Sequence, residues 1–198
     1  VIAKIEKPQA VERIEDIIET FDGFMIARGD LGVEMPLEQV PVVQKRVISL
    51  ARRNAKPVIV ATQMLDSMVN ASRPTRAEVS DCANAVLDGA DALMLSGETS
   101  VGRYPVVTVQ TMARIIQSTE DHGLARMAAI DWKPLTRGGV IAKAAAEVAY
   151  RVGAKYTVAF TQSGYSVRRL ARYRGSIPTL AFTPINVVRS QLSLTWGV

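Results

Sequence analysis

Gly23-Phe-Met-Ile-Ala-Arg-Gly-Asp-Leu-Gly-Val-Glu34 passes from a continuous apolar run to an aspartate that follows a glycine. The residues from Phe24 to Ile26 are too continuously apolar for a strand with one face in water, so they indicate a parallel strand covered on both faces. Gly29 and Gly32 permit a sharp turn and bring amide N–H groups close to a ligand. The run therefore predicts a buried strand that ends at the carboxylate of Asp30, placed either as a metal or phosphate ligand or as a helix cap.

Three further apolar runs alternate with helical patterns along the same part of the chain. The expected strands lie at 1–5, from 23 onward, at 58–61 and at 92–95, and the expected helices at 8–21, 36–54, 75–86 and 105–118. Strands recurring roughly every 25 to 35 residues between helices are typical of βαβ units. The pattern predicts an α/β fold with a parallel sheet.

Each expected strand ends in polar residues of an unusual kind. These endings are Lys4-Ile-Glu6, Arg28-Gly-Asp30, Thr62-Gln63 and Ser96-Gly-Glu-Thr99. In parallel α/β folds, and above all in TIM barrels, ligands bind at the carboxyl ends of the strands. Because such ends meet at one edge of a sheet, four polar endings in a row favour one shared site over four independent solvated turns.

A second, smaller unit follows a polar connector. We expect a barrel-type unit at 1–120, a connector at 121–136 and an α/β unit at 137–198, the last with helices at 139–151 and 166–172 and strands at 156–160 and 179–182. Residues 133–198 hold 10 of the 24 Lys and Arg residues but only 1 of the 19 acidic residues. No aromatic-interleaved or other nucleic-acid-binding motif accompanies that charge, so we expect phosphorylated small molecules and no nucleic acid as its partners.

Composition narrows the class of protein further. The chain is 48% hydrophobic and 22% charged, as globular proteins are, and it has no apolar run of membrane-spanning length. Its one cysteine, Cys82, excludes an internal disulfide and fits a reducing cytosol, so we expect a cytoplasmic protein without a membrane partner. Its one histidine argues against a zinc site and against a Ser-His-Asp triad as the basis for function.

The strand-end residues suggest metal-assisted chemistry on an anion. Lys4 and Glu6 are two residues apart in a strand, so their side chains point to the same side. With Asp30, Glu6 makes a pair of carboxylates, and Mg²⁺ or Mn²⁺ is commonly held by one or two carboxylates together with substrate oxygens and water. Thr62 and Ser96 offer hydroxyls for hydrogen bonding or proton relay, or simply bond their own backbone. A phosphoryl group or an enolate would suit such a site.

Several motifs, taken in order, resemble those of pyruvate kinase. They are Lys4-Ile-Glu6, Ile26-Ala-Arg-Gly-Asp-Leu-Gly32, Lys56-Pro-Val-Ile-Val-Ala-Thr-Gln-Met-Leu65, Arg73-Pro-Thr-Arg-Ala-Glu78, Asn84-Ala-Val-Leu-Asp-Gly-Ala-Asp91 and Met94-Leu-Ser-Gly-Glu-Thr99. The resemblance implies the second half of a (β/α)8 TIM barrel, with four βα units, followed by part of a βαβ C-terminal domain. It also implies transfer of a phosphoryl group from phosphoenolpyruvate to ADP, giving pyruvate and ATP, with Mg²⁺ or Mn²⁺ and K⁺.

The resemblance assigns roles to particular residues. Lys4 would stabilise the transferring phosphoryl group and the enolate, while Glu6 and Asp30 would hold the divalent metal. The amides of Gly29 and Asp30, with Thr62, would hold the substrate carboxylate.

Two further assignments come from the same resemblance. Thr62, or a water relay that includes Ser96 and Glu98, would help to protonate the enolate. In the basic unit, Thr161, Ser163, Gly164 and Ser166 resemble a loop that grips the phosphate of an effector, or they form a simple helix cap. The family also implies a homo-oligomer, a tetramer, with the segment 73–78 near a subunit interface.

The match starts at what would be the fifth barrel strand. The arginine, asparagine and aspartate that grip K⁺ and phosphates in the family are therefore expected outside this chain, and the isolated chain is expected to carry half an active site and little activity. Two alternatives stay open: another Mg²⁺-dependent phosphoenolpyruvate or enolate enzyme on a similar barrel, and a phosphometabolite-binding regulatory module without activity.

Overall fold

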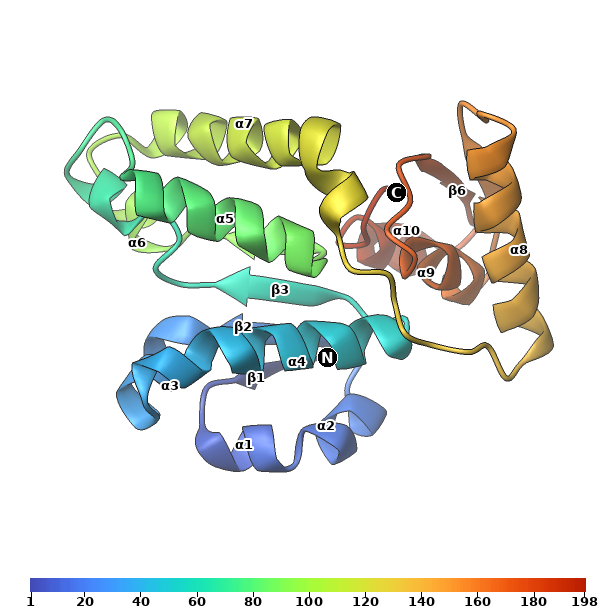
Figure 1. The fold of residues 1–198 in the computed structure, drawn as a ribbon, viewed down its shortest axis with the longest axis horizontal. Helices are drawn as coiled ribbons and strands as arrows, with labels where there is room; N and C mark the ends of the chain where they lie inside the picture. Colours follow the sequence, from blue (N-terminus) through green and yellow to red (C-terminus); the bar gives the residue numbers. More distant parts are fainter.

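The computed structural model describes all residues, 1–198, and contains two parallel sheets (Figure 1). The larger sheet has four strands in the order β1-β2-β3-β4: β1 (Ile2–Ile5), β2 (Gly23–Ala27), β3 (Val58–Ala61) and β4 (Ala92–Met94). Of its two central strands, β3 is buried along its whole length, and β2 is buried except at Met25. The predicted parallel α/β class is confirmed, and β1 and β4 each keep one side without a hydrogen-bonded strand.

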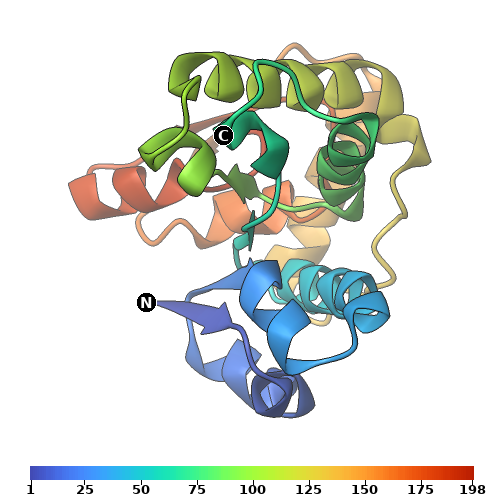
Figure 2. The ribbon, with the colours of Figure 1, turned by 90° about the vertical axis from the view of Figure 1, so that its left-hand side faces the viewer.

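Helices connect and cover the strands of this sheet. They are α1 (Pro8–Glu12), α2 (Ile14–Thr20), α3 (Arg28–Glu34), α4 (Val40–Arg53), α5 (Arg76–Asp88), α6 (Gly97–Ser100) and α7 (Pro105–Gly123), with short 3₁₀ turns at 37–39, 66–69 and 124–126. In both views they follow an arc from α1 and α2 at one end to α7 at the other (Figures 1 and 2). A core of 22 buried apolar residues lies between the sheet and these helices.

The limits of α5 follow directly from its sequence. The Thr75 hydroxyl accepts the Glu78 N–H at 3.2 Å, and the Glu78 carboxylate accepts the Thr75 N–H at 2.7 Å, which makes a capping box. Gly89 ends the helix in the left-handed region, with φ of 96°. A Cβ at Gly89 would lie 2.9 Å from the Arg52 side chain, so the position also needs a residue without one.

Three local expectations were wrong. The helix expected over 8–21 is two helices, because the backbone of Arg13 leaves helical geometry at ψ of 30°. Only the second helix, α2, buries isoleucines. The helix expected to end at residue 118 continues to Gly123, since no glycine or proline interrupts it earlier. Gly29 and Gly32 make no sharp turn, because both lie inside the helix α3 and neither has a positive φ.

The second unit is smaller and has a core of its own. It consists of α8 (Arg137–Arg151), β5 (Thr157–Phe160), α9 (Tyr165–Ala171), β6 (Thr179–Phe182) and α10 (Asn186–Leu192). β5 and β6 pair in parallel, as predicted, and four buried residues form the core: Ala159, Val167, Val188 and Leu192. No helix of the chain combines the length and the apolar character needed to cross a membrane.

A buried ion pair joins the two units at the turn that leads into β4. The Arg174 guanidinium donates to the Asp91 carboxylate at 2.6 Å and to the Gly89 carbonyl at 2.8 and 3.0 Å. Asp91 also accepts the N–H groups of Val58 and Trp196, each at 3.0 Å. Both side chains of the pair are at most 3% exposed. The start of β4 is therefore fixed to the second unit by fully desolvated charges.

Replacing Arg174 with Met should lower the free energy of unfolding by about 3 kcal/mol, because it leaves the Asp91 carboxylate buried without its cation. The matched control is Arg151→Met, which removes a solvent-exposed pair with Glu147 and should cost less than about 1 kcal/mol. Urea unfolding of the two variants measures both values. Equal losses would show that the buried pair does not hold the units together.

Candidate active site

Lys4 and two carboxylates form a compact charged cluster at the carboxyl ends of β1 and β2. The Lys4 Nζ lies 2.5 Å from Glu6 Oε2 and 2.9 Å from Asp30 Oδ2. The parallel register pairs Lys4 with Met25, so Asp30, in the first turn of α3, lies within reach of the lysine. The sheet thus brings together three residues that the sequence placed at strand ends.

The ionisation of this cluster is set by its own members. Hydrogen bonds from Lys4 to Glu6 and Asp30 raise the pKa of Lys4 above its ordinary 10.5, and the bond with Lys4 lowers the pKa of Asp30 below its ordinary 3.8. The contribution of Lys4 to stability is present below pH 10.5 and is lost as the pH rises through its raised pKa. That of Asp30 is present above pH 3.8 and is lost as the pH falls through its lowered pKa. Lys4 and Asp30 therefore form an ion pair at neutral pH.

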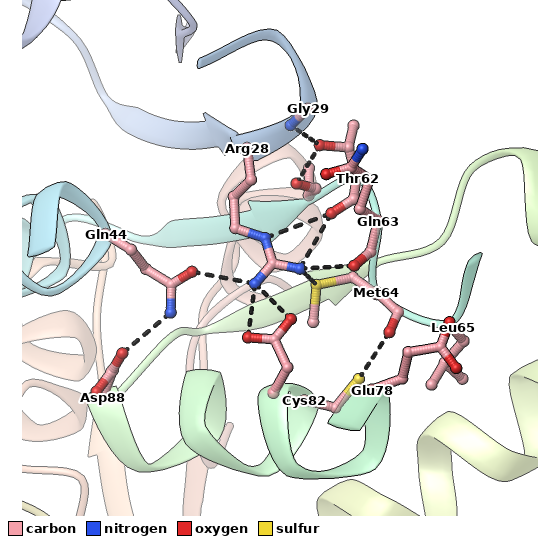
Figure 3. A network of polar contacts seen from close by, with 12 residues as sticks. Arg28, Gly29, Gln44, Thr62, Gln63, Met64, Leu65, Glu78, Cys82 and Asp88 are labelled. Carbon is pink, nitrogen blue, oxygen red and sulfur yellow. Dashed lines mark hydrogen bonds and ion pairs between the residues drawn. The ribbon is translucent and has the colours of Figure 1, made fainter. Parts of the chain in front are cut away.

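Thr62, just after β3, faces the same rim. Its hydroxyl accepts the Gly29 N–H at 2.7 Å and donates to the Ala61 carbonyl at 2.6 Å (Figure 3). A Cβ at Gly29 would lie 3.3 Å from that hydroxyl oxygen, so the glycine serves close approach between two strand ends. The amide of Gly29 and the hydroxyl of Thr62 thus meet where β2 and β3 end, and each is a hydrogen-bond partner of the other.

Thr62 and Gln63 have left-handed backbones, with φ of 69° and 53°. This conformation is unfavourable for residues with a side chain, and for a β-branched threonine it is a genuine outlier. Strained backbone of this kind concentrates at functional sites. This conformation was not predicted from the sequence, which placed the unusual backbone at Gly29 and Gly32, after the neighbouring strand.

Glu98 links the ends of β3 and β4. Its carboxylate, 2% exposed, accepts the Leu65 N–H at 3.2 Å and the Ser96 N–H at 2.7 Å. Ser96 is half-buried at the start of α6. The residues predicted at the four strand ends therefore lie along one continuous rim, from Lys4 to Glu98.

The predicted effector loop lies in the second unit, at the end of β5. The Thr161 hydroxyl accepts the Gly164 N–H at 2.9 Å, and Gly164 has φ of 80° immediately before α9. Ser163 and Ser166 are exposed. The Thr161 contact closes the loop on itself, which is the arrangement of a turn that precedes a helix.

The donor set at the rim fits a hard divalent cation. No group of three or more His, Cys, Asp or Glu residues is arranged to hold a metal. Mg²⁺, however, is usually bound by one or two carboxylates, with water and substrate oxygens in the remaining positions. Glu6 and Asp30 supply two such carboxylates, both turned toward one positive charge, the Lys4 ammonium. They are the residues that would hold the metal.

A lysine, two carboxylates and a hydroxyl at the carboxyl rim of a parallel sheet lie where α/β folds of the barrel type bind their ligands. Two family models match the chain: "Pyruvate kinase, barrel domain" at residues 1–109 and "Pyruvate kinase, alpha/beta domain" at residues 140–198. The chain belongs to the pyruvate kinase family. Its larger sheet is accordingly part of a barrel, and its second unit is part of the α/β domain.

Relatives match over the whole chain. Pyruvate kinases of Mycobacterium intracellulare and Corynebacterium efficiens are 62% and 60% identical to it over 197 residues. The crystal structure of a pyruvate kinase from Cryptosporidium parvum superposes with a TM-score of 0.91 at 40% identity. In each case 100% of this chain is covered, but only 41% or 42% of the relative. Neither alternative class of protein is favoured by these matches.

Replacing Lys4 with Met should raise the pKa of Asp30, because the hydrogen bond and the positive charge of Lys4, the largest causes that lower it, are lost. A carboxyl-detected NMR titration of the chain measures this pKa. Lys7→Met, which removes an exposed lysine paired with Glu34, should leave it unchanged. An Asp30 that titrates identically in all three proteins would contradict the cluster.

Proposed function

We propose that this chain takes part in the transfer of a phosphoryl group from phosphoenolpyruvate to ADP, giving pyruvate and ATP. The observation that carries the proposal is the Lys4 ammonium held between the carboxylates of Glu6 and Asp30 at a strand-end rim. The pyruvate kinase relatives support it by name. Such a transfer is catalysed mainly by positioning and by neutralising charge on the phosphoryl oxygens, which is what a lysine at this rim offers.

Lys4 is assigned to stabilise the negative charge that shifts on the substrate during the reaction. Its ammonium carries a full positive charge at neutral pH, since the neighbouring carboxylates raise its pKa. It can donate to the phosphoryl oxygens and then to the enolate oxygen from which the phosphoryl group departs. A side chain that is half exposed, at 52%, remains free to turn from Glu6 and Asp30 toward such a substrate.

Glu6 and Asp30 are assigned to Mg²⁺ or Mn²⁺. The metal, when bound, would neutralise phosphoryl charge and orient the substrate oxygens. K⁺ is part of the proposal for the complete enzyme, with most of its ligands contributed from outside this chain. ADP is likewise expected to bind where the rim is completed by other residues.

Gly29, Asp30 and Thr62 are assigned to the carboxylate of phosphoenolpyruvate. Gly29 and Asp30 lie in the first turn of α3, where backbone N–H groups have no partner within the helix and attract anions. In the absence of substrate the Gly29 N–H is satisfied by the Thr62 hydroxyl. A carboxylate oxygen at this point would take over one hydrogen bond from each group.

Protonation of the enolate is assigned to the rim between β3 and β4. Pyruvate forms when a carbon of the enolate receives a proton, so a hydroxyl or water with access to a proton store is required. Thr62 supplies one hydroxyl. The Ser96 hydroxyl and the buried Glu98 carboxylate are assigned to a relay through a water, because in the structure Glu98 accepts the Ser96 N–H and not its hydroxyl.

The wider context belongs to the same proposal. We assign the protein to the cytoplasm, to a homo-oligomer, a tetramer, and to control by a phosphorylated effector at Thr161, Ser163, Gly164 and Ser166. The single cysteine, Cys82, is buried and free, and burial raises the pKa of its thiol to about 12, which disfavours the reactive thiolate.

Pyruvate release from phosphoenolpyruvate and ADP, with Mg²⁺ and K⁺, tests the function. A pyruvate kinase that holds these residues in a complete barrel should be active, and Lys4→Met should lower kcat by on the order of 100-fold because one charged donor is removed. Lys7→Met is the matched control and should retain activity. Equal activity of Lys4→Met and wild type would contradict the proposal.

The isolated chain should release little or no pyruvate in the same assay. Its sheet has four strands with two unpaired edges, and a closed barrel of this class has eight. Turnover by the chain that is comparable to the complete enzyme and depends on Lys4 would overturn the idea that it carries half a site.

A further inference from the structure

Arg28 is a charged residue buried beside the candidate site, and neither the metal, the substrate nor the proton route requires it. It is 8% exposed and lies at the start of α3, next to Gly29. Its guanidinium is surrounded by acceptors from three other parts of the chain: the turn after β3, α4 and α5 (Figure 3). A buried guanidinium with this many partners must serve a specific geometry, since its desolvation is costly without them.

One side of the guanidinium binds the strained turn. Nη2 donates to the Thr62 carbonyl at 3.1 Å and to the Gln63 carbonyl at 2.8 Å, and Nε lies 3.4 Å from the Thr62 carbonyl. These are the carbonyls of the two left-handed residues. The left-handed backbone turns both carbonyls to one side, where a single planar group contacts them together.

The other side of the guanidinium is held in place. Nη1 donates to the Asp81 carboxylate of α5 at 2.7 and 2.9 Å, and it lies 3.4 Å from Gln44 Oε1 of α4. Gln44 in turn donates to Asp88 at 3.0 Å. The orientation of the planar fork is thus fixed by two helices before it contacts the turn.

We propose that Arg28 is a positioning residue, which holds Thr62 and Gln63 in the left-handed conformation so that the Thr62 hydroxyl faces the Gly29 amide and the substrate. The role of Thr62 in this statement rests on the proposed function. The conformational part stands by itself, because nothing in the local sequence Thr-Gln favours positive φ without the two carbonyl contacts.

Arg28→Lys is the informative variant. It keeps a positive charge for Asp81, but an ammonium lacks the planar fork that contacts two carbonyls and a carboxylate at once. A second substitution, Gln63→Gly, makes positive φ freely accessible at that position. We call the contacts of Arg28 with the Thr62 and Gln63 carbonyls the clamp. Together, Arg28→Lys and Gln63→Gly separate loss of the clamp from a general loss of stability, because glycine relieves only the backbone restraint. Arg46→Lys, at an exposed pair with Glu15, is the matched control.

NMR on the full 198-residue chain tests the clamp and does not require enzymatic activity. Positive φ brings the Hα of a residue close to its own amide proton, so wild type and Arg46→Lys should show strong intraresidue Hα–HN NOEs at residues 62 and 63. Arg28→Lys should weaken them, and the Gly29 amide should exchange faster with solvent. Unchanged NOEs and exchange in Arg28→Lys would overturn the clamp.

Kinetics of the complete enzyme test the positioning role. Arg28→Lys should lower kcat by on the order of 10- to 100-fold. The KM for ADP should change little, because the proposed function places ADP where the rim is completed by residues outside this chain. Adding Gln63→Gly should recover part of the lost kcat. Unchanged kcat despite weakened NOEs, or a loss that Gln63→Gly does not relieve, would overturn the role. A wild-type enzyme without pyruvate activity would overturn the proposed function and the role of Thr62 with it, while the NOEs would still decide the clamp.

Discussion

The parallel pairing of β1 to β4 is the constraint on which the site depends. Consecutive strands lie beside one another, and their register brings every carboxyl end to the same edge. Charges that are far apart in sequence therefore meet there: Lys4 contacts Asp30, and the loop after β3 contacts Glu98 after β4. A slip in register would separate the lysine from its carboxylates, so the fold and the chemistry of the rim share one cause.

Two buried arginines stabilise the backbone at the ends of β3 and β4, where the pairing of the strands does not fix it. Arg28 contacts the strained turn at the end of β3, and Arg174 fixes the start of β4 to the second unit through Asp91. Each guanidinium contacts backbone carbonyls as well as a carboxylate, so neither is a simple ion pair. The rim is thus supported from within the barrel unit and from the α/β unit, at opposite ends of neighbouring strands.

Most of the fold and of the candidate site could be predicted because the signals were local. Continuous apolar runs predicted the strands, and polar residues at the strand ends predicted the positions of Lys4 and Asp30. The left-handed turn at Thr62 could not be predicted, because nothing in Thr-Gln favours it and its stabilising partner is 34 residues away. The Arg174 pair, 83 residues apart, was hidden for the same reason. The limits of the domains and the roles of the site residues stay predictions.

Binding of Mn²⁺ to the chain, followed by the EPR signal of the free ion, tests most directly whether the rim is a metal site. Glu6→Gln and Asp30→Asn should each weaken binding by on the order of tenfold, because each removes one charged oxygen donor. Glu12→Gln, at an exposed position of α1, should bind as wild type does. Wild-type affinity in both Glu6→Gln and Asp30→Asn would contradict the account, because it would show that neither carboxylate is a ligand of the metal.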